Sequence, residues 1–142
     1  MAGIVMRGFL FACALAGLAT LGAFPAGAAG CDDAATQADM NECSGKAYKA
    51  ADQKLNSDYR RIERRLSDDP DAKKLLVAAQ RAWIAFRDAE CGFSASAAAG
   101  GSLHPAIVAR CLTDLTEARI QSFGTYLNCE EGDVGCPVPP AD

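Results

Sequence analysis

Residues 79–91 read AQRAWIAFRDAEC, a stretch that decides the fold because it combines a helical apolar pattern, the one tryptophan of the chain and a cysteine. Apolar residues recur here at three- and four-residue steps, which places them on one helix face: Leu76, Ala79, Trp83 and Phe86. The charged residues Arg81, Asp88 and Glu90 fall elsewhere on the helical wheel. We therefore predict a core helix that a disulfide holds at its end.

The chain before this stretch predicts a second long helix. Residues 46–91 contain no glycine and one proline, Pro70, so a break at residues 68–70 between two helices is the simplest account. Asp69 can cap the later helix, and Pro70 suits its first position. The earlier helix is expected to begin at Thr36, capped together with Asp39, and to run to about residue 66. Its expected buried face comprises Met40, Cys43, Ala47, Ala51, Leu55, Tyr59, Ile62 and Leu66.

The chain after this stretch predicts a loop and a third helix. Residues 92–102 are rich in glycine, serine and alanine, and His104 and Pro105 then begin a helix. Its expected inner positions are Val108, Leu112, Leu115, Arg119, Phe123 and Tyr126. Because no alternating strand pattern persists, we predict an all-α fold, a small antiparallel three-helix bundle stapled by disulfides. The tail comprises residues 128–142, and its last residues are expected to be disordered.

The first 28 residues carry the pattern of an export signal. Arg7 supplies the positive charge, residues 8–24 are apolar, and small residues at 25–29 offer a cleavage site. We therefore divide the chain into a signal peptide (1–28), a helical domain (29–127) and an acidic, proline-rich tail (128–142). A periplasmic or secreted protein is expected, with no membrane span in the mature chain. Lipid modification of Cys31 is the alternative, although it would leave one cysteine unpaired.

Of the seven cysteines, six remain once Cys13 leaves with the signal. An even number in an exported chain indicates three disulfides, although six cysteines allow fifteen connectivities. Short loops favour pairing in sequence order: Cys31 with Cys43, Cys91 with Cys111, and Cys129 with Cys136. Each such bond would stabilise the fold by about 2.5 to 3.3 kcal/mol if its effect is entropic. With no C-x-x-C pair and a single histidine, neither a metal nor a cofactor is expected.

The charge balance limits the class of partner. Loss of residues 1–28 leaves 13 of the 14 basic residues against all 18 acidic ones, a net charge of −5. This balance disfavours nucleic acid and anionic membranes and allows attraction to cationic proteins. We interpret one basic cluster as a solvated helix face, because Asp58 and Glu63 interrupt it: Arg60, Arg61, Arg64 and Arg65.

No group of residues predicts catalysis. His104 has no identifiable nucleophile, metal or acid partner, and we interpret it as the start of a helix. Asp88 and Glu90 lie two residues apart on a helix and would not face each other across a glycosidic bond. We therefore do not expect an enzyme.

Three polar residues near the predicted core are interpreted as structural. Arg87 is expected to pair with a nearby carboxylate or with one on another helix. Gln80 and Arg119 are expected to link two helices by hydrogen bonds.

Three ordered pieces of the chain resemble one family. Residues 31–62 contain a Thr-Gln-x-x-Met-Asn-x-Cys box followed by an Ala-Asp-x-x-Leu-Asn-x-x-Tyr helix. Residues 79–91 resemble the central box of that family, and residues 100–119, GGSLHPAIVARCLTDLTEAR, resemble its third box. In these boxes the chain is similar to the LprI-like lysozyme-inhibitor domain family of bacterial exported proteins, over roughly residues 31–127.

The resemblance carries expectations for individual residues. The places of the family's cysteines fall on Cys31, Cys43, Cys91 and Cys111, and those of its other signature residues on Gln80, Trp83, Arg87, Thr116 and Arg119. These matches support the fold more than an activity. The pair Cys129 and Cys136 lies outside the shared boxes.

By resemblance, we expect an inhibitor that binds a lysozyme-type peptidoglycan hydrolase and protects peptidoglycan. Many lysozymes are cationic around an acidic catalytic cleft, so an acidic partner gains long-range attraction. A loop over residues 92–104, held at its base by a disulfide, is the expected plug, with contacts from Phe93, Ser102, Leu103 and His104. The alternative is a periplasmic protein-interaction module that serves another partner.

Overall fold

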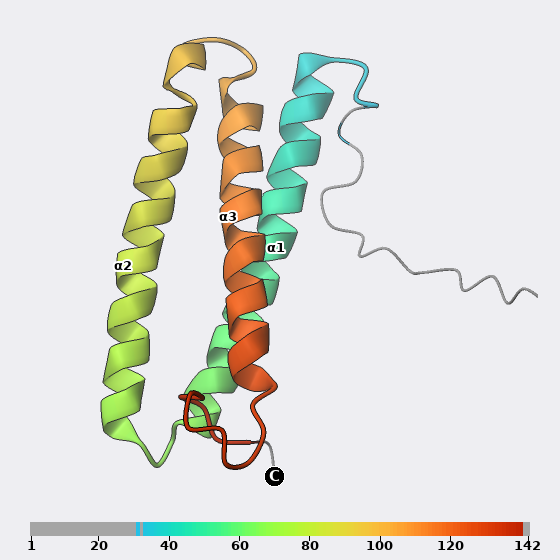
Figure 1. Ribbon diagram of the computed structural model, residues 1–142. Helices are drawn as coiled ribbons and strands as arrows, with labels where there is room; N and C mark the ends of the chain where they lie inside the picture. The colour runs from blue at the N-terminus through green and yellow to red at the C-terminus, as the bar shows by residue number, and fades with distance from the viewer. Residues whose placement is uncertain (1–30, 32, 141–142) are drawn as a thin grey trace, which may run out of the picture.

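Three long helices dominate the computed structural model, which describes residues 31 and 33–140. They are α1 (Gln37–Arg65), α2 (Pro70–Ser94) and α3 (His104–Leu127), with a short 3-10 helix, η1 (Ser96–Ala98), between the last two. α1 and α3 run in the same direction, and α2, which lies between them in sequence, runs in the opposite direction (Figure 1). The all-α three-helix fold predicted from the sequence is therefore confirmed. The predicted signal peptide lies outside the described residues.

The helix starts follow from local chemistry. The Thr36 hydroxyl accepts a hydrogen bond from the Asp39 N–H at 3.1 Å, and the Asp39 carboxylate accepts one from the Thr36 N–H at 3.2 Å. This capping box satisfies two groups that a helix end leaves without partners. At α2 the Asp69 carboxylate accepts from the Ala72 N–H at 2.9 Å, and Pro70 is the first helical residue. Both predicted starts are correct.

The core lies where α1 and α3 meet, and α2 packs mainly on α3, which stands between the other two helices (Figure 1). Full burial of a large apolar side chain contributes about 1.5 to 3 kcal/mol. The buried apolar cluster is Leu55, Ile62, Leu66, Leu76, Phe123, Leu127 and Val138. Small side chains line the part of α3 that approaches α1: Ala106, Ala109, Thr113 and Thr116. Because these residues form the buried face of α3 together with Phe123 and Leu127, several positions predicted as core are only half-buried: Val108, Leu112, Leu115, Arg119 and Tyr126.

The buried face of α2 differs from the prediction. Ala79 is exposed and Phe86 is 55 % exposed, so both were wrongly assigned to the core, whereas Trp83 is half-buried. The buried residues of α2 are Leu76, Gln80, Arg87 and Cys91. The reason is that an apolar pattern treats polar side chains as exposed, although a polar group with partners can be buried.

The tail is packed onto the bundle as far as residue 140, and residues 141–142, at the end for which disorder was predicted, lie outside the described residues. Val138 is 3 % exposed and belongs to the apolar core. The Arg65 guanidinium donates to the Leu127 carbonyl at 2.8 Å and to the Pro139 carbonyl at 3.4 Å. Arg65 therefore satisfies a carbonyl at the end of α3 and holds the tail beneath α1 and α3 (Figure 1).

Three disulfides join the cysteines that the short loops favour. The bonds are Cys31–Cys43, Cys91–Cys111 and Cys129–Cys136, with Cα–Cα distances of 5.7, 5.5 and 5.9 Å. These separations suit the geometry of the bond. Because Cys31 is paired here, lipid attachment would require a different state of that cysteine.

Candidate functional site

The loop between α2 and α3 forms one end of the bundle (Figure 1). α2 continues through Ser94, so the predicted loop start at Gly92 is wrong, and the loop comprises residues 95–103 with η1 inside it. In the last turn of α2 the Cys91 carbonyl accepts hydrogen bonds from the Ala95 N–H at 3.2 Å and from the Ser94 hydroxyl at 3.3 Å. Gly100 has a φ of 77°, a conformation that other residues rarely adopt. The Cys91–Cys111 disulfide ties the base of this loop.

An asparagine on α1 holds the other side of the loop. The Asn41 side-chain amide donates to the Ser102 carbonyl at 2.8 Å, and its oxygen accepts from the Ala106 N–H at 3.0 Å. One turn earlier, the Gln37 side-chain oxygen accepts a hydrogen bond from the Ser102 hydroxyl. A primary amide can donate and accept at once, which suits it to bridge a loop and a helix start. The end of the loop is thus fixed to α1.

These two amides were missed as site residues in the sequence. Both belong to the Thr-Gln-x-x-Met-Asn-x-Cys box, and they lie four residues apart, on one face of α1. That spacing was an available signal, but a partner more than sixty residues away cannot be derived from helix periodicity.

The four expected contact residues lie near this end of the bundle. Ser102, Leu103 and His104 are consecutive, and His104 is the first residue of α3, as predicted. Ser102 is exposed, whereas Leu103 and His104 are half-buried. Phe93 lies on the last turn of α2 rather than in the loop, and its side chain is 76 % exposed.

Replacement of Asn41 by alanine is expected to loosen the loop without unfolding the bundle. Two hydrogen bonds are lost, each with a net value of about 1 kcal/mol, so we expect a loss of about 1 to 2 kcal/mol in unfolding free energy. Amide exchange should accelerate at Ala106, whose N–H loses its partner. Asn56→Ala is the matched control, because in the described chain the Asn56 side-chain amide bonds to Asp52 of the same helix and not to the loop. If the amide of Ala106 exchanged at the same rate in the two variants, this role for Asn41 would be contradicted.

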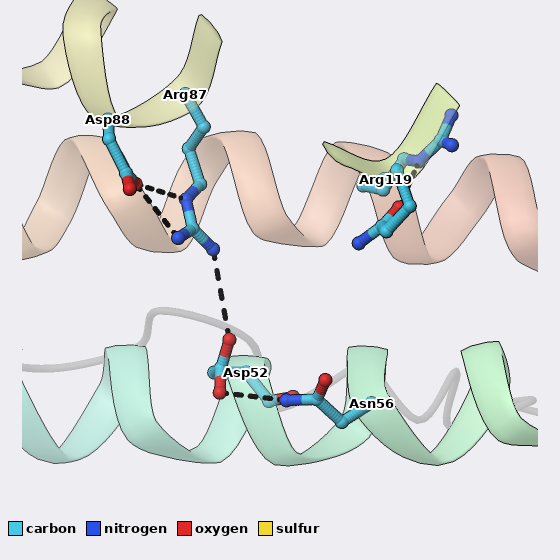
Figure 2. Close-up of polar contacts among 6 residues, drawn as sticks. Asp52, Asn56, Arg87, Asp88 and Arg119 are labelled. Carbon is cyan, nitrogen blue, oxygen red and sulfur yellow. Dashed lines mark hydrogen bonds and ion pairs between the residues drawn. The ribbon is translucent and has the colours of Figure 1, made fainter. Parts of the chain in front are cut away.

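A second group of residues lies between the helices. Arg87 is 6 % exposed, donates to the Asp88 carboxylate at 2.8 Å and forms an ion pair with Asp52 of α1 at 3.7 Å (Figure 2). Its guanidinium lies over the rings of Trp83 and Tyr48, 5.1 and 5.5 Å from their centroids. Burial raises the pKa of the Tyr48 hydroxyl, and the positive charge of Arg87 opposes that rise. Arg87 therefore connects α2 to α1.

Arg119 continues this arrangement on α3. It donates to the Gln80 side-chain oxygen at 3.2 Å, so the predicted hydrogen bond between two helices is present. The guanidinium also lies over the rings of Phe123 at 4.6 Å and Trp83 at 5.9 Å. Burial lowers the pKa of Arg119, but a guanidinium stays protonated at neutral pH. Thr116 is fully buried, and its hydroxyl has no hydrogen-bond partner within the described chain.

Four of the five signature residues thus form one polar and aromatic seam: Gln80, Trp83, Arg87 and Arg119. The seam holds helices together and offers no nucleophile. Within residues 31 and 33–140, no group of three or more acidic, histidine or cysteine side chains could hold a metal ion. Over the same residues, no helix has the length and apolar character that a membrane span requires.

Residues 30–123 match the family model described as lysozyme inhibitor LprI. The chain belongs to the LprI family. A relative from Rhizobium meliloti (strain 1021), named Uncharacterized protein R02472, is 38 % identical over 112 residues, which cover 71 % of this chain and 81 % of the relative. No solved structure gives a significant match. The tail, with its disulfide and Val138, lies beyond the region that the LprI model matches.

The LprI resemblance seen in the sequence is therefore confirmed, and its boxes fall on two parts of the structure. The first box supplies the helix cap at Thr36 and the two amides that hold the loop. The central and third boxes supply the seam and the Cys91–Cys111 disulfide. The family description is that of an inhibitor rather than an enzyme.

Proposed function

We propose that this protein binds a lysozyme-type peptidoglycan hydrolase outside the cytoplasm and protects peptidoglycan from hydrolysis. Membership of the LprI family carries this proposal. Three disulfides suit an oxidising compartment, and a net charge of −4 for the full sequence suits a cationic partner. A signal peptide over residues 1–28 would deliver the chain to that compartment.

The loop of residues 95–103 is the part that we propose enters the enzyme cleft. It projects from one end of a narrow bundle and is fixed at its base by Cys91–Cys111 and at its side by Asn41. A loop that is already ordered loses little conformational freedom on binding. Ser102, Leu103, His104 and the exposed ring of Phe93 are the proposed contacts at the rim.

Protection of a peptidoglycan suspension against several lysozymes tests this proposal. The full coding sequence is expressed for export, the oxidised protein is purified, and lysis is followed by turbidity at low and high salt. We expect dose-dependent protection that weakens as salt screens the attraction between an acidic inhibitor and a cationic enzyme. No protection by folded protein against any lysozyme would overturn the proposal and favour an interaction module with another partner in the cell envelope.

A matched pair of variants locates the binding end. Ala99→Arg adds bulk and positive charge to an exposed loop residue, and Val134→Arg adds the same group to a fully exposed residue of the tail. We expect Ala99→Arg to raise the concentration for half-protection at least about tenfold, because the long side chain blocks close approach of the loop to the walls of the cleft. Val134→Arg should change the concentration for half-protection by less than about twofold from that of the unchanged protein. Equal effects would place the binding surface elsewhere.

A further inference from the structure

The outer side of α2 carries a second apolar face, which the rest of the described chain leaves uncovered. Its residues recur at steps of three and four and are all exposed: Leu75, Ala79, Ala82, Phe86, Ala89 and Phe93. We call these six residues the α2 strip. Leu75, Phe86 and Phe93 are 72, 55 and 76 % exposed. α2 stands at the edge of the bundle, so one side of it is open to a partner (Figure 1).

The composition of this side differs from that of a solvated helix face. Ala78, Ala85 and Gly92 border the strip on one side, and no charged residue lies among these nine positions. A helix face in water normally carries charged or polar residues, and contiguous exposed apolar surface marks a contact site. Steps of three and four over nineteen residues give a nearly straight seam about 27 Å long, as in paired helices.

We propose that the α2 strip pairs in antiparallel fashion with the α2 strip of a second copy of this chain. An antiparallel pair with its two-fold axis level with residue 84 sets Phe86 against the second copy's Ala82 and Ala79 against the second copy's Ala89. Leu75 then meets the second copy's Phe93 at each end. A large side chain therefore faces a small one at the centre, as close packing requires.

The parallel arrangement fits less well. It would set Phe86 against Phe86 and Phe93 against Phe93, and it would leave alanine opposite alanine at the other central levels. The Phe86 pair would then hold the helices apart beside Ala82 and Ala89, whereas the antiparallel pair confines its large layers, Leu75 against Phe93, to the two ends.

The area of the strip fits a modest dimer. An aromatic side chain offers about 150 to 250 Å² of surface, so the exposed parts of Phe86 and Phe93 contribute roughly 250 Å² per copy. With Leu75 and the small residues, the total reaches roughly 600 Å² per copy, the lower end of the range for specific interfaces. Because an interface of this size is small, we expect a dissociation constant in the micromolar range.

Sedimentation of the full oxidised protein, exported and free of lysozyme, over about 1 to 500 µM tests the dimer. We expect a reversible monomer–dimer equilibrium. Phe86→Lys should weaken it at least about 30-fold, because a buried aromatic is replaced by a charge. Ile84→Lys is the matched control, since Ile84 lies on another side of α2 and is 38 % exposed. A monomer at every concentration, or equal weakening by both variants, would overturn the proposal.

A size exchange tests the antiparallel register. Ala82→Phe alone should weaken association, because the new ring meets the second copy's Phe86. The double variant Ala82→Phe/Phe86→Ala should restore most of it, because large again faces small and the composition is unchanged. No recovery would overturn the antiparallel pairing.

The dimer and the lysozyme proposal can fail separately. Ala82 and Phe86 lie outside the loop, whereas Ala99 lies outside the strip. If lysozyme rather than a second copy covers the strip, the protein stays monomeric and Phe86→Lys abolishes protection, which overturns the dimer. Phe93 belongs to both surfaces, so protection is best measured below the dissociation constant of the dimer.

Discussion

Replacement of Cys91 and Cys111 by alanine is expected to abolish protection against lysozyme and to lower the free energy of unfolding by about 3 kcal/mol. The bond closes a loop with a sequence separation of 20, and a cross-link of this length removes about that much entropy from the unfolded chain. In the folded protein the bond sets the distance between the two ends of the loop. Without it, ordering the loop would oppose binding. Urea unfolding and the turbidity assay measure the two effects.

The matched control is the Cys129→Ala/Cys136→Ala double variant. This bond closes a loop with a sequence separation of 7, so its loss should lower the free energy of unfolding by about 2.5 kcal/mol. It lies in the tail, at the end of the bundle opposite the loop (Figure 1). Protection by folded protein should therefore persist. Loss of protection in both variants to the same extent would mean that general stability, not the loop, controls inhibition.

Arg87→Ala is expected to destabilise the bundle by about 2 to 4 kcal/mol. The substitution removes a buried cation, leaves a space beside Trp83 and Tyr48, and deprives Asp52 and Asp88 of their shared partner. Because the side chains of Asp52 and Asp88 are 40 and 56 % exposed, water can solvate them, which keeps the loss below that of a fully buried pair. Unfolding in urea can be followed by fluorescence of Trp83, the one tryptophan.

Two further variants show whether the shape of the guanidinium matters. Arg87→Lys keeps the charge, but a lysine side chain cannot lie flat over two rings while it donates to Asp88. We therefore expect about half of the loss in unfolding free energy that Arg87→Ala causes. Lys74→Ala is the control on the same helix. Among the described residues Lys74 pairs with the exposed Asp71, so its replacement should change stability by less than about 0.5 kcal/mol. If Arg87→Ala and Lys74→Ala unfold at the same urea concentration, the seam does not hold α2.

Local signals in the sequence were sufficient to predict the three helices and the residues at which they begin. Thr36 with Asp39, and Asp69 with Pro70, act within one turn, so their chemistry can be read without knowledge of the fold. The same holds for the disulfides, since each joins cysteines that are close in sequence. The loop contacts were different, because Asn41 bonds to residues that lie 61 and 65 positions away.

The face of α2 could not be predicted from apolarity. Both sides of this helix are rich in apolar residues, so the pattern allowed a choice between Phe86 and Arg87 as the inner residue. The structure buries Arg87 because Asp52, Asp88 and two rings compensate its charge. Val138 was missed for a related reason: a single apolar residue among prolines carries no periodic signal, yet it closes the core.

The position of Asn41 beside the loop also determines at which end the protein can be attached to a surface. Asn41 lies in the second turn of α1, and Cys31 is bonded to Cys43 close by, so the described chain starts at the loop end. α1 is about 43 Å long, and residues 138–140 lie near its far end. A bead or sensor chip attached before residue 31 would therefore crowd the loop, whereas the same attachment after residue 142 would leave it facing the solution.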